Sequence, residues 1–153
     1  MFITNFFFKS TLSSCNSFIW ESKFKNFKKI KVLKSVNLDL LVGIDRQKKT
    51  LLNNTINFAD GNFTNNALLW GTRGNGKSSL IKSIIYEVNK KFKNLKLVQL
   101  NKNDIFDIEL IYAKLGEFRS YRFIIFIDDL SFEKIDSDYK IIKSTLDGSI
   151  QNQ

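Results

Sequence analysis

The order of apolar and polar positions predicts alternating helices and strands from residue 42 onward. Apolar residues recur at three- and four-residue spacing over 45–58, which predicts a helix that Asp45 can cap. A short apolar run over 67–70 follows and predicts a buried strand. A glycine-rich stretch separates this strand from a second amphipathic helix, which we expect over about 77–91.

The same alternation continues toward the end of the chain. Residues 95–100 and the continuous apolar run 123–127 are predicted strands, and a helical stripe after Asp107 lies between them. A last helix is predicted at about 138–146, before Gly148. Strands that alternate with helices form a parallel sheet between helical layers, with right-handed crossovers. We therefore predict a three-layer α/β fold with a parallel sheet.

Residues 1–37 have a different pattern and form a basic, Phe- and Lys-rich segment before the main domain, 38–153. Residues 1–17 are expected to be a loosely structured leader. Over 18–41 the apolar residues stand at roughly helical spacing and predict the packing face of a helix: Trp20, Phe24, Phe27, Ile30 and Leu33. No apolar run approaches the about 20 residues of a membrane span, so we expect no signal peptide, no membrane anchor and a cytoplasmic protein.

The glycine-rich stretch fits the phosphate-binding pattern G-x-x-x-x-G-K-[ST] in full. Glycines let the backbone curl so that N–H groups point at phosphate oxygens, and the start of the next helix adds partial positive charge. Lys77 would reach the β- and γ-phosphates, the Ser78 hydroxyl would take one position on Mg²⁺, and Ser79 begins the helix. The loop residues expected to bind the nucleotide are Gly71, Thr72, Arg73, Gly74, Asn75, Gly76, Lys77, Ser78 and Ser79.

A glycine-rich turn that only caps a helix is the simpler alternative. Lys77 argues against it, because a cation is electrostatically misplaced beside the positive end of a helix unless an anion lies there. Phosphate binding is therefore the better explanation of this loop.

A carboxylate pair follows the third predicted strand, in the sequence FIIFIDDL. Asp128 fits the metal-associated role of a Walker B motif, and Asp129 can face the γ-phosphate and polarise an attacking water. Two carboxylates that merely end a strand are the alternative. Their position 51 residues after Lys77, with one full strand between, favours a catalytic set of Lys77, Asp128 and Asp129. The predicted metal ligands are then Ser78 and Asp128.

The paired acids also indicate a class of P-loop protein. Two acids directly after this strand are typical of the additional-strand ATPases. The sequence contains neither an LSGGQ-like signature of transporter ATPases nor an NKxD-like guanine-binding motif. ATP is therefore the expected nucleotide, in preference to GTP.

Composition narrows the chemistry further. The chain has no histidine and a single cysteine, Cys15, which excludes an internal disulfide, a Cys-rich metal site and a histidine base. The net charge is +9, and residues 1–40 carry seven Lys and two acids, a net +5. Such a basic segment can bind nucleic acid or anionic lipid, or can simply be a solvated face.

Two longer stretches resemble a known family. The motif NNALLWG before the loop and DDLSF after the strand are similar to those of the bacterial AAA+-like ATP-binding proteins grouped as domain of unknown function 815, and the resemblance covers about 38–150. It implies that Val42, Gly43 and Ile44 contact adenine. It also implies that Asp128 and Asp129 are the Walker B pair. Asn75 stands where the family usually has Thr or a similar residue, and Asn tolerates left-handed backbone angles.

The resemblance also predicts what should follow the Walker B strand. AAA+ domains continue into a sensor strand, a further strand, an arginine finger and a helical lid, whereas Arg119 and Arg122 here precede Asp128. We therefore expect a fragment or a truncated relative, with the C-terminal part of the core and the lid missing. In the complete protein a homo-oligomer would let a neighbouring subunit supply the arginine.

The functional expectation is an ATP-binding protein of AAA+ type that hydrolyses MgATP in the complete protein. One alternative is an ATP-gated, loader-like module with little turnover, in which the basic segment contacts the phosphates of nucleic acid. An inactive fragment is another. A P-loop kinase would need an acceptor site and lid arginines that the sequence does not show. ATP and Mg²⁺ are the expected ligands, and nucleic acid is the alternative partner.

Overall fold

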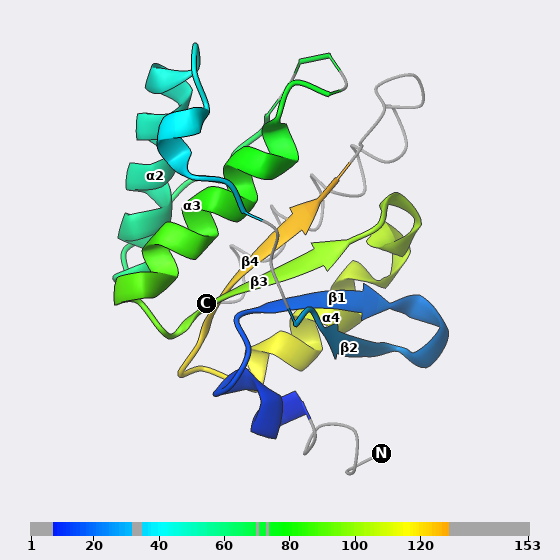
Figure 1. Cartoon of the computed structure of the whole chain (residues 1–153). Coiled ribbons are helices and arrows are strands. Elements are labelled where there is room, and N and C mark those ends of the chain that lie inside the picture. Colours follow the sequence, from blue (N-terminus) through cyan, green and yellow to red (C-terminus); the bar gives the residue numbers. More distant parts are fainter. Residues whose placement is uncertain (1–7, 32–34, 70, 73, 129–153) are drawn as a thin grey trace.

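The computed structural model describes residues 8–31, 35–69, 71–72 and 74–128. Helices and strands alternate along most of this part of the chain, and one sheet lies at its centre (Figure 1). Their order is β1 (Ser17–Glu21), η1 (Ser22–Phe24), β2 (Asn26–Lys29), η2 (Leu38–Leu40), α2 (Asp45–Ala59), α3 (Lys77–Lys91), β3 (Leu95–Leu100), η3 (Lys102–Asp107), α4 (Ile108–Gly116) and β4 (Arg122–Ile127).

The sheet has four described strands in the order β2-β1-β3-β4. β1, β3 and β4 run parallel, whereas β2 runs antiparallel to β1. The α/β class is thus confirmed, but the predicted parallel sheet is a mixed one. The antiparallel pair arises because the turn that joins β1 to β2 is too short for the crossover that parallel neighbours need. Lys25 closes this turn with a left-handed φ of 46°.

Each face of the sheet carries its own hydrophobic core. Leu95 and Leu97 of β3 join the core under α2 and α3, whereas Val98 and Leu100 of the same strand join the core on the opposite face. α4 and a short helical segment over 8–12 cover that second face. Figure 1 shows α2 and α3 together on one side of the sheet and α4 on the other. The predicted sheet between helical layers is therefore confirmed.

Most of the predicted elements beyond residue 42 are confirmed. α2, α3, β3 and β4 agree with their predicted ranges to within one residue at each end, and α4 follows Asp107 as expected. Asp45 is the first residue of α2 and does not cap it, because Ile44 takes the N-cap position. No helix in the described ranges combines the length and the apolar character that crossing a membrane requires.

The predicted strand at 67–70 is wrong in its described part. Residues 67–69 form no strand, and Leu68 is exposed. These three residues include no β-branched side chain, and no described strand pairs with them. A short apolar run without a partner therefore does not become a strand here. The predicted helix at 138–146 lies outside the described residues.

The N-terminal segment differs most from the prediction. Residues 17–29 form the β1–β2 hairpin and not a helix, and Trp20 lies directly opposite Phe27 on it. Their ring centroids are 4.9 Å apart. The separation of Trp20 from Phe27 in the chain matches two turns of a helix. Two side chains that face the core from opposite strands of the hairpin therefore have the same spacing in the sequence as two on one face of a helix, which explains the wrong prediction.

The expected loose leader is also wrong in its described part. Phe8 and Leu12, on the short helical segment, are buried in the core under α4. The ring of Phe8 stacks on Phe27 with centroids 4.5 Å apart and meets Phe18 edge-on at 5.1 Å. Residues on both sides of position 37 therefore share one sheet and one core.

Candidate functional site

The glycine-rich loop leads directly into α3. Gly76 precedes the helix with a φ of 74°, and Gly74 and Gly71 have φ values of 86° and 143°. Residues with a Cβ rarely adopt such angles, so glycine is required at these positions by backbone conformation. Thr72 and Asn75, like Gly71 and Gly74, are exposed. The described residues from 71 to 75 are therefore accessible from solvent.

Lys77 is the first residue of α3, and its side chain folds back over the loop. Its Nζ donates hydrogen bonds to the carbonyl oxygens of Gly71, at 2.9 Å, and Thr72, at 2.8 Å. Both acceptors are neutral. The ammonium is an ionised donor, and its hydrogen bonds become stronger when an anion offers an ionised acceptor in place of these neutral carbonyls. The loop thus holds a cation where the backbone amides at the start of α3 also favour an anion.

Ser78 and Asp128 meet across the site, although they are 50 residues apart in the sequence. The Ser78 Oγ lies 2.8 Å from each carboxylate oxygen of Asp128 and donates its hydrogen to that carboxylate. Asp128 directly follows β4, and Ser78 lies in the first turn of α3. The contact arises because the carboxyl end of β4 and the amino end of α3 reach the same edge of the sheet.

The oxygens of Ser78 and Asp128 suit a hard cation. Hydroxyl and carboxylate oxygens are ligands that Mg²⁺ accepts, and Mg²⁺ commonly keeps several waters and takes one or two protein ligands beside phosphate. The described residues contain no group of three His, Cys, Asp or Glu side chains that could hold a metal by themselves. A Mg²⁺ between Ser78 and Asp128 would therefore be shared with a bound phosphate.

The segment before α2 approaches the same loop. The Leu41 side chain lies 4.0 Å from the position that a Cβ on Gly76 would occupy. Val42 is 85% exposed, Gly43 has a φ of 82°, and Ile44 packs against the core under α2 and α3. Val42, Gly43 and Ile44, which the family resemblance implies to contact adenine, therefore directly follow Leu41, whose side chain lies beside the start of α3.

Lys48 holds this segment in place, and sequence reasoning missed it. Its Nζ donates to the carbonyl oxygens of Leu38, at 2.9 Å, and Leu41, at 3.1 Å, and lies 3.2 Å from the Asp45 carboxylate. The side chain is only 17% exposed. Because its acceptors are backbone carbonyls, the residue types at 38 and 41 carry no signal for this contact.

The remaining predicted residues are less informative. Ser79 is partly buried in the first turn of α3. Arg73 and Asp129 lie outside the described residues. Arg122 points away from the loop: its guanidinium donates to the Gly61 carbonyl at 3.3 Å and lies 5.7 Å from the Phe58 ring centroid, so it secures the end of α2.

Comparison with known proteins identifies the family. The family described as "Protein of unknown function (DUF815)" matches residues 13–153. The chain belongs to this family. The match begins before β1, so the DUF815 region includes the hairpin as well as the loop and Asp128. No curated protein and no solved structure matches the chain.

Proposed function

We propose that this DUF815 protein binds ATP together with Mg²⁺ at the loop 71–79. The contact between the Ser78 hydroxyl and the Asp128 carboxylate, at 2.8 Å, carries the proposal. It joins the last residue of the phosphate-binding pattern to the first acid of FIIFIDDL. A loop that only capped a helix would have no need of a carboxylate from a strand 50 residues away.

The proposed roles follow from the position of each group. The loop amides and the Lys77 ammonium bind the β- and γ-phosphates, because both present positive charge at the start of α3. Ser78 and Asp128 hold the Mg²⁺, which when bound neutralises phosphate charge. Val42, Gly43 and Ile44 contact the adenine, and Asp129 orients the attacking water.

The proposal extends to turnover of ATP. We propose an AAA+-type ATPase whose neighbouring subunit in a homo-oligomer supplies the arginine. Positive charge from a second subunit stabilises the charge on the transferring phosphate, as arginine fingers do. Arg122 does not perform this task, because its guanidinium is held by Gly61 and Phe58. The isolated chain is therefore expected to bind ATP and to hydrolyse it slowly.

Calorimetric titration of the purified chain with MgATP tests the proposal. Wild-type protein should bind, and Lys77→Ala should lose binding because the phosphates lose their ammonium partner. Lys90→Ala is the matched control: it removes a cation from the exposed far end of the same helix, and its affinity should equal that of the wild type. A thermal melt of each variant shows that it is folded. Equal MgATP affinity of the wild type and Lys77→Ala, or no binding by a folded wild type, refutes the proposed site.

A further inference from the structure

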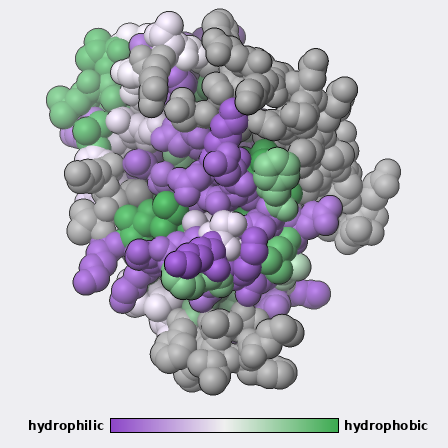
Figure 2. All heavy atoms as spheres, turned by 90° about the vertical axis from the view of Figure 1, so that its right-hand side faces the viewer, coloured by the Kyte–Doolittle hydropathy of each residue, from purple (hydrophilic) through white to green (hydrophobic). Residues whose placement is uncertain are grey.

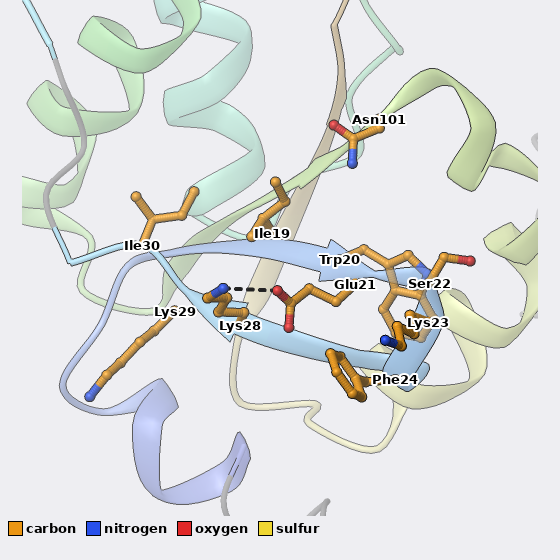
Figure 3. Close-up of a pocket in the computed structure, with 10 residues that line it drawn as sticks. All are labelled: Ile19, Trp20, Glu21, Ser22, Lys23, Phe24, Lys28, Lys29, Ile30 and Asn101. Carbon is orange, nitrogen blue, oxygen red and sulfur yellow. Dashed lines mark hydrogen bonds and ion pairs between the residues drawn. The ribbon is translucent and has the colours of Figure 1, made fainter.

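The β1–β2 hairpin, with Ile30 directly after it, supplies all the lining residues except Asn101 of an open groove of about 590 Å³ (Figure 3). Ile19 and Ile30 are part of its apolar floor, and Asn101, just beyond β3, lies at its upper edge. Lys23 and Phe24 come from the turn η1, and Lys28 comes from β2. The described residues of the loop 71–79 contribute none of its lining, so the groove is separate from that loop.

Cations outnumber acids along this hairpin. Residues 21–31 contain five lysines and one acid, Glu21, a net charge of +4. Glu21 pairs with Lys28 at 2.9 Å inside the groove, and Lys25 pairs with Asp107 at 2.6 Å outside it. Lys23 is exposed at the end of the groove. Figure 2 shows the side toward which the hairpin turn points in Figure 1, where hydrophilic side chains gather with apolar ones between them.

An exposed aromatic ring lies among these cations. Phe24 is 65% exposed, and the Lys23 Nζ lies 5.6 Å from its ring centroid. The other aromatic side chains of the hairpin, Phe18, Trp20 and Phe27, are buried in the core under α4. Phe24 therefore makes no comparable contribution to packing, and its ring is available to a ligand.

We propose that this groove binds single-stranded nucleic acid, with phosphates at Lys23 and Lys28 and an unpaired base stacked on Phe24. A basic groove with an exposed ring provides the two contacts that single strands use, ion pairs to the backbone and stacking on an aromatic side chain. A phosphate that binds Lys28 competes with Glu21 for the ammonium. Removing the Glu21 charge therefore strengthens binding.

The geometry favours single strands over duplex DNA and over lipid. A two-stranded ribbon can enter the major groove of a duplex, but β1 is also paired with β3, so the hairpin is not a free ribbon. Membrane binding relies on buried apolar area together with basic residues, whereas the apolar floor of this groove lies between charged side chains. A base can reach that floor, while a flat bilayer meets the lysines first.

Fluorescence anisotropy of a labelled oligo(dT) strand of about 20 nucleotides, without ATP, tests this proposal. Replacing Lys23 and Lys28 together by Gln should lower affinity about tenfold at low salt and reduce the slope of log affinity against log salt by about 1.4, because two phosphate contacts are lost. Phe24→Ala should lower affinity about tenfold and leave the slope unchanged. Glu21→Gln should raise affinity about threefold, since one repulsive charge is removed.

The matched control lies at the exposed end of α3. Lys90 pairs with Glu87 at 2.6 Å, and its Nζ lies 5.3 Å from the Tyr86 ring centroid. This site therefore has the same two features as the groove, an ion pair and an aromatic ring near a lysine. Lys90→Gln and Tyr86→Ala should leave affinity unchanged. An equal loss in these controls, or unchanged affinity in the groove variants, overturns the proposal. Tighter binding to a duplex of the same length overturns the proposal in favour of duplex DNA. Binding of the protein to vesicles with one-quarter phosphatidylglycerol, without binding to oligo(dT), overturns it in favour of a membrane surface.

Discussion

The indole Nε1 of Trp20 donates a hydrogen bond to Asp107 Oδ2 at 2.9 Å, which joins β1 to the residue before α4. The Ser22 hydroxyl donates to the same oxygen at 2.6 Å, and the Lys25 ammonium reaches the other oxygen at 2.6 Å. Three donors from one hairpin thus converge on a single carboxylate that is 14% exposed. This cluster fixes the basic hairpin against the rest of the domain.

The Asp107 carboxylate is expected to stabilise the fold in its charged form. Burial opposes its ionisation, but the hydrogen bonds from Lys25, Ser22 and Trp20 outweigh burial and lower the pKa of Asp107 from 3.8 to about 2. The unfolded chain therefore takes up this proton at higher pH than the folded one does. The stabilisation is complete above about pH 5 and is mostly lost by about pH 2.

Urea unfolding of wild type and Asp107→Asn checks this expectation. At pH 7 the variant should have a free energy of unfolding lower by about 1–2 kcal/mol, a value reduced from the full pKa difference because Lys25 is half exposed to solvent. The difference should narrow between pH 4 and pH 2. Asp39→Asn, at an exposed site, is the control. A difference that persists unchanged down to pH 2 would contradict the role of the Asp107 charge.

Glycine at position 76 is expected to be indispensable for the shape of the loop. Gly76→Ala should lower the free energy of unfolding by about 1–2 kcal/mol, because alanine is strained at a φ of 74°. Gly116→Ala is the matched control: Gly116 ends α4, its φ is not in the left-handed region, and no atom lies within 4 Å of an added Cβ. That change should be neutral or slightly stabilising. Equal effects of the two substitutions in thermal or urea unfolding would refute the conformational argument.

The sequence was most informative where structure depends on local spacing. α3 and β3 could be predicted to the residue because their apolar positions repeat within one element. The meeting of Ser78 with Asp128 was also accessible, because the phosphate-binding pattern and the acid after β4 predicted a shared Mg²⁺ site, although the strand expected at 67–70 does not form in its described part.

Contacts between distant segments could not be read in this way. The pairing of Trp20 with Phe27 depends on a turn whose left-handed residue is Lys25, and lysine is not a residue that signals such a turn. Lys48 bonds backbone carbonyls, which every residue has, so its acceptors have no sequence signature. The hairpin and the Lys48 contact therefore required the structure.

Ser78 is expected to determine how strongly Mg²⁺ enhances ATP binding. Ser78→Ala removes the hydroxyl that lies 2.8 Å from the Asp128 carboxylate, and so one of the two proposed protein ligands. Affinity for ATP with Mg²⁺ should fall about tenfold, whereas affinity for ATP in excess EDTA should change little, because the loop amides and Lys77 remain. Calorimetry under both conditions measures the two affinities. An equal loss in both would assign Ser78 to the shape of the loop instead of to the metal.

Lys48 is expected to position the base-binding segment without touching the phosphates. Lys48→Met keeps the length of the side chain but removes the hydrogen bonds to Leu38 and Leu41, so the segment that continues into Val42 is no longer held beside Gly76. Two lost hydrogen bonds of about 1 kcal/mol each would allow up to about a 30-fold loss, and partial relaxation should leave a loss of about 5- to 10-fold in ATP affinity. Affinity for inorganic tripolyphosphate, which has no base, should be unchanged.

Lys49→Met provides the matched control for this prediction, because Lys49 is the next residue on α2 and is exposed. Its affinity for both ligands should equal that of the wild type, which separates the Lys48 contacts from the mere loss of one positive charge. If Lys48→Met weakened ATP and tripolyphosphate equally, Lys48 would act on the phosphate loop or on overall stability. If it changed neither, the segment around Val42 would not depend on Lys48 for its position. Only a loss confined to ATP supports a base-binding segment held by α2 through these two carbonyls.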